Sequence, residues 1–441
     1  MKKAVNGAFR ITVSEKDPTK MTKQKLAVIG AGVAGITTAL LLEDRFDVTL
    51  FEKNNYIGGH TNTVNVKQSD GSTVAVDTGF IVCNDRTYPN FHKLLKKLNT
   101  KWRYADMSFS VVDEKTGLQY GSKNINTIFA DRRNIFSFQY YKFLVGIQRF
   151  WQIAKADLNN ESVNSLSLQE YITLHSIPES VVQNFILPIS AAIWSTPDKL
   201  MLDFPVGIFL KFYGNHGLLS VANQPRWQTV VGGSASYVKA FESQFKGIIK
   251  LNCGSLKVNR FQDYVEIINQ QNQVEKFDYV VIATHADQVL SVIQNPSDME
   301  QKLFSVWKYL NNDTILHTDE SLLPSNLRAR ASWNYRRELQ SDGSRPLSIS
   351  YHMNNLQGLS TKDQYVVTLN SKTNISPDKV IARFDYTHPH FTVESMKTQN
   401  PIMQMNSENR TFFAGSYLRF GFHEDAVMSG VNIAKYFGVE F

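Results

Sequence analysis

The sequence is poor in cysteine, and its two cysteines are far apart. Cys83 and Cys253 form no C-x-x-C pair, and no Cys and His residues recur at the spacing of zinc ligands. A disulfide framework and a structural zinc site are therefore excluded, and we predict no metal site. Two free thiols fit a reducing compartment, so we expect a cytoplasmic protein.

Long uninterrupted hydrophobic runs are also missing. The longest apolar stretch, Leu26–Leu42, is broken by three glycines, which is typical of a strand, a turn and a helix rather than a membrane span. Residues 1–24 form a polar extension without the apolar segment of a secretory signal. We expect a soluble protein, with peripheral contact at the inner membrane surface as the alternative.

Positive charge is in excess but is not concentrated in one run. The net charge is +7, yet no cluster of Lys and Arg resembles a nucleic-acid patch, so we expect no nucleic-acid partner. The excess favours an anionic partner such as a phospholipid surface, an acyl carrier or a pyrophosphate group, and a solvated basic surface is the alternative. The sequence contains no G-x-S-x-G and no Walker motif, which argues against hydrolase and kinase functions.

What the sequence does contain is enough chain for two domains and many aromatic residues. Its 441 residues exceed the size of one compact core. The 28 phenylalanines fit a packed aromatic core or, alternatively, an aromatic-lined ligand cavity.

A nucleotide-binding β-α-β unit opens the folded part of the chain. Lys25–Ile29 predicts a buried parallel strand, G-A-G-V-A-G (30–35) a tight turn, and Ile36–Leu42 a helix. The glycines allow a pyrophosphate to approach the backbone, and the helix N-terminus favours its charge. Val48–Glu52 predicts the second strand, and Glu52 ends it where an acid binds the ribose hydroxyls, which disfavours NADP.

Further glycines and strands indicate FAD rather than NAD. Gly58 and Gly59 follow the second strand, where the long ribityl chain of a flavin nucleotide needs close backbone approach and an NAD domain does not. Val76–Val82 predicts a strand broken by Gly79 against the flavin edge. The domain is completed only late in the chain, by strands at 278–284 and 411–416 and a helix from about Ala426.

Several motifs resemble those of the flavin-containing amine oxidase superfamily. They are G-G-H-T-N-T-V, V-D-T-G-F-I-V-C-N-D-R-T-Y-P-N, A-A-I-W-S-T-P, N-H-G-L-L, R-W-Q-T-V-V-G-G-S, S-W-N-Y and G-F-H-E-D. From Lys25 onward the chain is similar to a bacterial branch of NAD/FAD-binding proteins, which also resembles the N-terminal extension of plant cyclopropane fatty-acid synthases. That branch is associated with methyltransferases that modify unsaturated acyl chains, so the resemblance suggests a lipid substrate and an acyl-modifying methyltransferase partner.

The resemblance implies an α/β fold in which an FAD-binding, Rossmann-type (two-dinucleotide-binding) domain is interleaved with an α+β substrate domain. We predict the FAD domain at 25–100, 225–300 and 405–441, and the substrate domain at 101–224 and 301–404. Alternating runs from Thr314 to Tyr386 predict an antiparallel sheet in the substrate domain.

Two segments of the substrate domain are predicted to be helical, Asn124–Ala156 and Ser167–Phe185. The first carries basic side chains among Phe and Tyr. We expect an amphipathic helix packed on a core, and a helix lying on a membrane surface is the alternative.

The superfamily's usual Arg after the second glycine pair is replaced here by His60, and no C-terminal Cys is placed to attach a flavin. We therefore expect non-covalent FAD. The predicted FAD contacts are Gly30, Gly32, Val33, Ala34, Gly35, Glu52, Lys53, Gly58, Gly59, His60, Thr61, Gly79, Phe80, Val258, Gly415, Glu424, Asp425, Ala426 and Val427.

Flavin oxidation of a substrate delivers a hydride to N5 and leaves negative charge near N1 and O2. The start of the last helix, Asp425–Val427, is expected to stabilise that charge. Glu424 or Asp425 is expected to contact the ribityl hydroxyls, and helix capping alone is the alternative.

Histidines and tryptophans supply the remaining candidates. His216 and His423 are the candidate general bases, with a hydrogen-bonded structural role as the alternative for each. Trp194 and Trp333 are expected to line the substrate pocket or else to belong to the core. We interpret five other histidines as structural: His285, His317, His352, His388 and His390.

The sequence therefore predicts an FAD-dependent oxidoreductase that transfers a hydride from an apolar substrate, a fatty-acyl chain or similar lipid, to flavin N5. Two alternatives remain open. One is a true amine oxidase, and the other is a flavin-stabilised accessory subunit that presents lipid to a methyltransferase. One flavin scaffold serves oxidases, dehydrogenases, desaturases and isomerases, so the pattern does not separate these outcomes.

Overall fold

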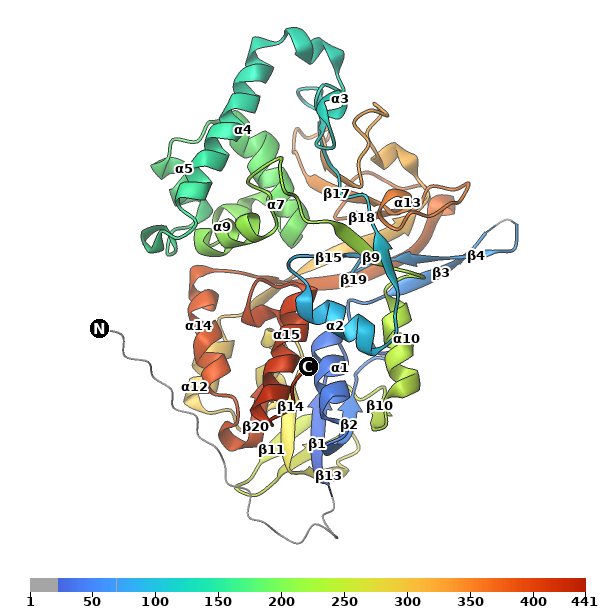
Figure 1. Ribbon diagram of the computed structural model, residues 1–441, viewed down its shortest axis with the longest axis vertical. Helices are drawn as coiled ribbons and strands as arrows, with labels where there is room; N and C mark the ends of the chain where they lie inside the picture. Colours follow the sequence, from blue (N-terminus) through green and yellow to red (C-terminus); the bar gives the residue numbers. More distant parts are fainter. Residues whose placement is uncertain (1–22, 69) are drawn as a thin grey trace.

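A parallel sheet of five strands forms the lower half of the molecule in the computed structural model, which describes residues 23–68 and 70–441 (Figure 1). The predicted polar extension lies outside the described residues except for its last two. β-branched and aliphatic residues build β1 (Gln24–Ile29), whose last four residues are buried. The strand order is β10 (Ile248–Lys250), β2 (Phe46–Phe51), β1 (Gln24–Ile29), β14 (Tyr279–Ile282) and β20 (Thr411–Phe413).

Two helices that are far apart in sequence pack together on this sheet. Helix α1 (Val33–Leu42) and helix α15 (His423–Tyr436) approach so closely that a Cβ on Gly430 would lie 2.9 Å from the Ala34 carbonyl oxygen. Helix α15 begins three residues before the predicted start at Ala426. The reason is a cap, because the Asp425 carboxylate accepts a hydrogen bond from the Phe422 N–H.

Short strands and helices surround the parallel sheet. The predicted strand Val76–Val82 is divided in two, because the chain turns at Gly79, where a Cβ would lie 2.2 Å from the His60 carbonyl oxygen. The short strands are β3 (Thr63–Lys67), β4 (Thr73–Asp77), β5 (Val82–Asn84), β6 (Trp102–Tyr104), β9 (Trp227–Val230), β11 (Lys257–Arg260), β12 (Val265–Ile268) and β13 (Val274–Phe277). The helices are α2 (Pro89–Lys97), α10 (Ala235–Gln244), α11 (Val289–Val292), α12 (Asp298–Phe304) and α14 (Val393–Gln404).

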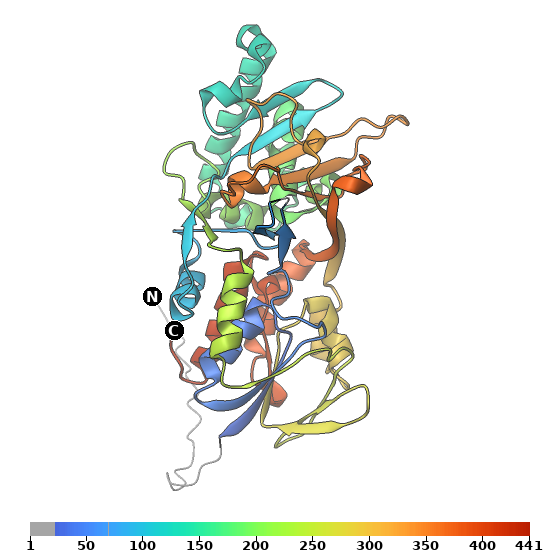
Figure 2. The ribbon, with the colours of Figure 1, turned by 90° about the vertical axis from the view of Figure 1, so that its right-hand side faces the viewer.

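A seven-stranded sheet crosses the upper half (Figure 2). It is larger than predicted and is not purely antiparallel, because a hairpin of β7 (Phe109–Asp113) and β8 (Leu118–Gly121) joins it through a parallel pairing of β7 with β16 (Trp333–Arg337). The order is β19 (Val380–His390), β15 (Lys308–His317), β18 (Val366–Leu369), β17 (Leu347–His352), β16 (Trp333–Arg337), β7 (Phe109–Asp113) and β8 (Leu118–Gly121).

Helices cover one side of this sheet. The predicted helix Asn124–Ala156 is interrupted, because Ser137 accepts a hydrogen bond from the Tyr140 N–H and starts a new helix there. The elements are α3 (Ile125–Ile128), a 3₁₀ turn (Arg132–Phe136), α4 (Phe138–Ala156), α5 (Leu168–Leu174), α6 (Glu179–Val181), α7 (Leu187–Trp194), α8 (Asp198–Leu202) and α9 (Val206–Asn215). A further short helix, α13 (Met353–Leu356), lies in the connection between β17 and β18.

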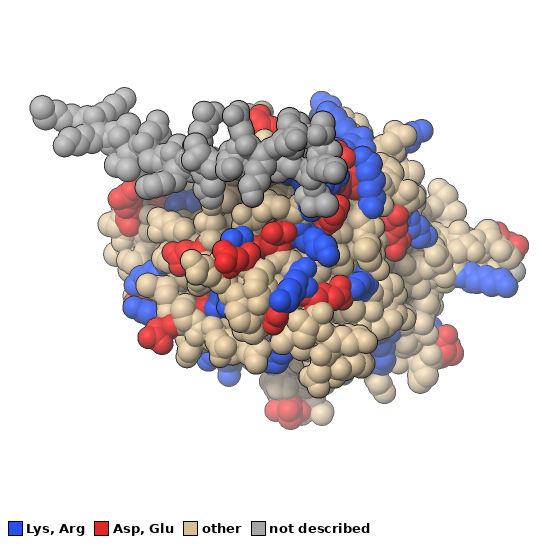
Figure 3. Space-filling model, turned by 90° about the horizontal axis from the view of Figure 1, so that it is seen from below, with Lys and Arg blue, Asp and Glu red and all other residues tan. Residues whose placement is uncertain are grey.

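Two surface properties bear on partners. Across residues 23–68 and 70–441, no helix has the length and apolar character that a membrane crossing requires. The face seen from below mixes Lys and Arg with Asp and Glu (Figure 3). Such a mixture produces no field of one sign on this visible face.

Candidate active site

A cavity of about 890 Å³ begins at the N-terminus of α1. Gly30 turns the chain out of β1 with φ +102°, a conformation that L side chains rarely adopt. A Cβ added to Gly32 would meet no protein atom within 4 Å, so the space beside this residue is open. The first intrahelical hydrogen bond runs from Ile36 N to the Gly32 oxygen. The N–H groups of Val33, Ala34 and Gly35 in the first turn therefore have no intrahelical acceptor and are free to bind an anion.

Glu52 lies one residue after β2, inside the same cavity. One of its carboxylate oxygens accepts a hydrogen bond from Ala31 N at 2.9 Å and the other from Asn54 N at 3.0 Å. A carboxylate has about four lone-pair directions, so acceptor capacity remains for ribose hydroxyls.

The second glycine pair brings the loop after β2 against the first glycine turn. Gly58 N donates to the Ala31 oxygen at 2.8 Å, and a Cβ on Gly59 would lie 3.3 Å from Gly32 Cα. Both glycines have positive φ, so larger residues would be strained here. The two loops form a backbone-lined cradle for an extended dinucleotide, and these residues fit FAD.

We expect Glu52→Gln to weaken FAD retention by about 1–3 kcal/mol, because a charge-assisted hydrogen bond to ribose is lost. Equilibrium dialysis followed by flavin absorbance measures the effect. Glu43→Gln is the matched control, since Glu43 is also a buried carboxylate that accepts a backbone hydrogen bond, from Lys246 N at 2.8 Å, but it does not line the cavity. Equal FAD occupancy in the Glu52 variant and the wild type would show that Glu52 does not bind the ribose.

Histidines gather where β19 meets the cradle. The His60 ring lies 5.6 Å from the His285 ring and 5.1 Å from the His388 ring, and its Nε2 is buried without a hydrogen-bond partner among the described residues. Burial lowers the pKa of His60, and burial together with the neighbouring His60 lowers the pKa values of His285 and His388 to about 3. All three are therefore neutral at pH 7, and a buried ring nitrogen is available to a ligand. Our interpretation of His285 and His388 as structural is at odds with their place in the cavity lining.

His423, the first residue of α15, lines the same cavity. Its ring stacks on Phe80 with centroids 3.7 Å apart, and its Nε2 is 2.9 Å from the Tyr237 hydroxyl. That hydroxyl is in turn 2.5 Å from Thr61 Oγ1. Burial lowers the pKa of His423 to about 3, so the ring is neutral over the working range of most enzymes.

The two acids of the last helix point into protein rather than into the cavity. Glu424 accepts hydrogen bonds from Asn90 N and Phe91 N at the start of α2. Asp425 caps α15 through Phe422 N, and burial raises its pKa to about 7. In this structure both acids therefore cap helices, Glu424 at the start of α2 and Asp425 at the start of α15.

Most of the predicted FAD contacts line this one cavity. Those in the lining are Gly30, Gly32, Val33, Ala34, Glu52, Lys53, Gly58, Gly59, His60, Gly79, Phe80, Gly415 and Ala426. Those outside it are Gly35, Thr61, Val258, Glu424, Asp425 and Val427. Gly35 has a packing role instead, because a Cβ there would lie 1.9 Å from the Gly30 oxygen.

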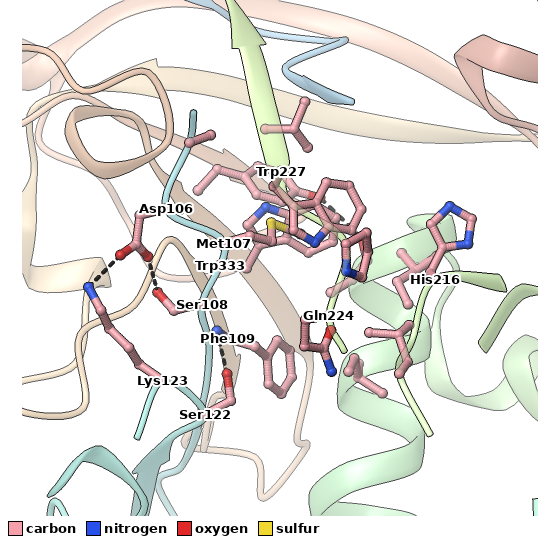
Figure 4. Close-up of a pocket in the computed structure, with 18 of the residues that line it drawn as sticks. Asp106, Met107, Ser108, Phe109, Ser122, Lys123, His216, Gln224, Trp227 and Trp333 are labelled. Carbon is pink, nitrogen blue, oxygen red and sulfur yellow. Dashed lines mark hydrogen bonds and ion pairs between the residues drawn. The ribbon is translucent and has the colours of Figure 1, made fainter. Parts of the chain in front are cut away.

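A second, larger cavity of about 1510 Å³ lies between the seven-stranded sheet and the helices. Met107, Trp227 and Trp333 cluster in it, as Figure 4 shows. Of the four charged residues in its lining, Asp106 pairs with Lys123, and Lys155 and Arg226 are exposed. An apolar ligand is the class that such walls favour.

The two cavities meet at a shared set of residues. Phe80, Tyr386, Phe422 and His423 line both, as do Gly79, Ile193, Ser195 and His388. A redox cofactor in the smaller cavity and a substrate in the larger one would therefore come into contact at this junction.

The remaining candidates divide between the cavities. His216 lines the larger one, but its Nδ1 is 3.0 Å from the Phe212 oxygen and its Nε2 is 3.0 Å from Thr87 Oγ1, so both nitrogens are engaged by protein. Trp333 lines the larger cavity, whereas Trp194 lines the cofactor-sized one and not the substrate pocket as expected.

Sequence reasoning missed the site residues Tyr386, His388 and Phe422, and did not single out Trp227. Phe422 and Trp227 lie inside the motifs G-F-H-E-D and R-W-Q-T-V-V-G-G-S, which provided a signal. Tyr386 and His388 alternate along β19 and so face one side of the sheet, but the sequence does not reveal which side meets the cofactor.

The family model for flavin containing amine oxidoreductase matches residues 33–436. The chain belongs to this family. It is an FAD-dependent oxidoreductase, and the glycine cradle described above has a lining that fits its cofactor.

Two curated relatives share short segments with this flavoprotein. The 4,4'-diaponeurosporene oxygenase of Staphylococcus haemolyticus is 46% identical over 43 residues, which cover 10% of this chain and 9% of the oxygenase. The carotenoid phi-ring synthase of Streptomyces griseus is 37% identical over 75 residues, which cover 17% of this chain and 14% of the synthase. The matches span less than a fifth of these relatives.

Solved structures share the fold across almost the whole chain. A fatty acid isomerase from P. acnes that produces CLA superposes with a TM-score of 0.68 at 15% identity, over 95% of this chain and 100% of the isomerase. Putrescine oxidase bound to putrescine superposes with a TM-score of 0.67 at 12% identity, over 94% of this chain and 98% of the oxidase. At these identities the likeness concerns the fold alone.

Proposed function

We propose that this flavoprotein holds FAD non-covalently and oxidises an apolar, lipid-like substrate such as a fatty-acyl chain. One observation carries the proposal: the large aromatic cavity joins the cofactor cavity at Phe80, Phe422 and His423. The names of the fatty acid isomerase and of the two carotenoid enzymes agree with such a substrate. An acyl-modifying methyltransferase as the partner stays a prediction from the sequence resemblance.

The positions of the two cysteines support non-covalent binding. Cys83 is buried outside the cavity lining, and burial raises the pKa of its thiol to about 12. Cys253 lines the cofactor cavity beside Glu52, to whose carbonyl oxygen its N–H donates at 2.8 Å. That is the ribose end of the cradle, so neither thiol is placed to bond to the ring.

When bound, FAD supplies a two-electron acceptor that takes a hydride from a substrate C–H bond. The protein holds the substrate chain between Trp227 and Trp333 and excludes water from the junction. The free N–H groups at the start of α15 favour negative charge that develops beside them. His423 is positioned by Tyr237 and stays neutral, so it orients the substrate or accepts a proton where the C–H is activated.

We expect His423→Ala to slow flavin reduction modestly, by about tenfold, while leaving substrate binding intact. The pH profile of the rate with a lipid should be the same in His423→Ala and in the wild type from about pH 5 to 8, because the pKa of His423 lies at about 3. Asp77 and Asp425, whose pKa values burial raises to about 7, titrate in that window in both proteins. With an amine the rate should instead rise with pH as the substrate loses its proton. Stopped-flow reduction across pH distinguishes the two substrates, and a fall of the lipid rate below pH 7 that disappears in His423→Ala would contradict the assigned state of His423.

A further inference from the structure

The segment from α3 to the first half of α4 projects from the top of the molecule in both ribbon views (Figures 1 and 2). We call residues 125–145 the apolar tip. Phe136 is 90% exposed, Phe138 79% and Ile125 74%. Ile135, Tyr141 and Val145 are exposed beside them. A cluster of large apolar side chains on one projection is uncommon on a monomer surface and marks a site of interaction.

The charges around the apolar tip are almost all positive. Between Gly121 and Ala156 the only acidic residue is Asp131, which forms an ion pair with Arg133 (Nη2 to Oδ2, 2.7 Å). Neither Lys142 nor Arg149 has an ion-pair partner in the part of the chain that the structure describes. The basic residues of this stretch are Lys123, Arg132, Arg133, Lys142, Arg149 and Lys155.

The apolar tip is continuous with the mouth of the larger cavity. Tyr141, Val145, Gln148 and Gln152 follow one another at helical spacing on α4, and the last two line the cavity. Ile125 belongs to the tip and also lines the cavity. Val221, 81% exposed, and Tyr104, 66% exposed, complete this outer part of the lining.

We propose that the apolar tip inserts into the surface of an anionic phospholipid bilayer, so that the mouth of the larger cavity faces the acyl chains. This inference rests on the proposed lipid substrate. Exposed aromatics flanked by unpaired Lys and Arg match the interface of an anionic bilayer, where apolar burial and attraction to the headgroups add together. An acyl chain would then enter the cavity without crossing water, which its apolar surface opposes. A second copy of the chain fits less well, because the facing tips would bring the same positive charges together.

Flotation of the FAD-loaded protein with vesicles tests the proposal. We expect binding to vesicles of phosphatidylcholine with phosphatidylglycerol and much weaker binding to phosphatidylcholine alone. Phe136→Ser with Phe138→Ser should reduce the partition coefficient at least about tenfold, since two exposed rings no longer insert. Lys142→Gln with Arg149→Gln should reduce the partition coefficient by about fivefold for each charge removed. Added salt should also reduce the partition coefficient of the wild type, because it screens the attraction to the headgroups.

Matched controls on the lower half of the molecule should leave binding unchanged. Phe261→Ser removes an exposed aromatic outside the tip, and Lys96→Gln with Lys97→Gln removes two exposed charges from α2. FAD content and melting temperature confirm that every variant is folded. Loss of binding in the controls as large as in the tip variants would overturn the proposal.

Two further results separate this inference from the proposed function. Vesicle binding that depends on the tip, without any lipid reducing the flavin, supports the docking surface and refutes the substrate. Flavin reduction by lipid in detergent micelles, without vesicle binding, refutes the docking surface alone. A dimer in light scattering that Phe136→Ser with Phe138→Ser dissociates would assign the tip to self-association and overturn the proposal.

Discussion

Gly32→Leu is expected to give a folded protein that contains essentially no FAD. The backbone of Gly32 has φ −70° and ψ 177°, which any residue adopts without strain. A Cβ there meets no protein atom within 4 Å, so the leucine side chain enters the cavity where the pyrophosphate is expected. Losing close backbone approach and phosphate hydrogen bonds should cost several kcal/mol, or more than about a hundredfold in affinity.

Two comparisons make the Gly32 result specific. Gly32→Ala adds a single methyl group and should retain more FAD than Gly32→Leu. Ala156→Leu places the same leucine on an exposed helix end and should bind FAD like the wild type. Absorbance at flavin wavelengths per mole of protein measures occupancy, and thermal melting of the apo forms measures stability. Full flavin content in Gly32→Leu would show that the cofactor does not pass over this turn.

Met107→Trp is expected to reduce kcat/KM for an apolar substrate by about a hundredfold without changing FAD content. Met107 is half-buried beside Trp227 and Trp333 in the larger cavity (Figure 4). A larger ring there fills space that the substrate chain needs, and overfilling costs about 1–3 kcal/mol in a packed site. Because Met107 does not line the cofactor cavity, flavin binding should be unaffected.

Met107→Ala is the matched control for the tryptophan variant. It enlarges the cavity and should preserve turnover of long substrates while weakening binding of short ones. Steady-state kinetics with a series of acyl chain lengths reads out both variants. If Met107→Trp and wild type had equal kcat/KM for every substrate tested, the larger cavity would not be the substrate site.

The sequence predicted the cofactor half of the fold well, because its constraints are local. Gly30 and Gly58 have positive φ, and Glu52 follows the end of a buried strand. Each of these requirements restricts the residue type at its own position, so it can be recognised in the local sequence. The match from residue 33 to residue 436 and the parallel sheet confirm the flavoprotein fold.

The substrate half was less predictable, because its contacts are formed between distant segments. The hairpin of β7 and β8 joins the large sheet next to β16, some 220 residues later, and nothing in its own sequence specifies that partner. His388 was interpreted as structural because a histidine in a strand gives no sign of the face it takes. The predicted 124–156 helix is broken at Ser137, which caps a new helix. A capping serine is a local sequence signal, but hydrophobic periodicity alone predicted one continuous helix.

Anaerobic mixing of the FAD-loaded protein with candidate substrates tests the central claim most directly. The flavin absorbance should bleach with a fatty-acyl lipid and should not bleach at a comparable rate with simple amines such as putrescine. Rapid bleaching by an amine with none by any lipid would contradict the account and identify an amine oxidase. Failure of both classes to bleach the flavin would also contradict it and would favour an accessory subunit that binds lipid without oxidising it.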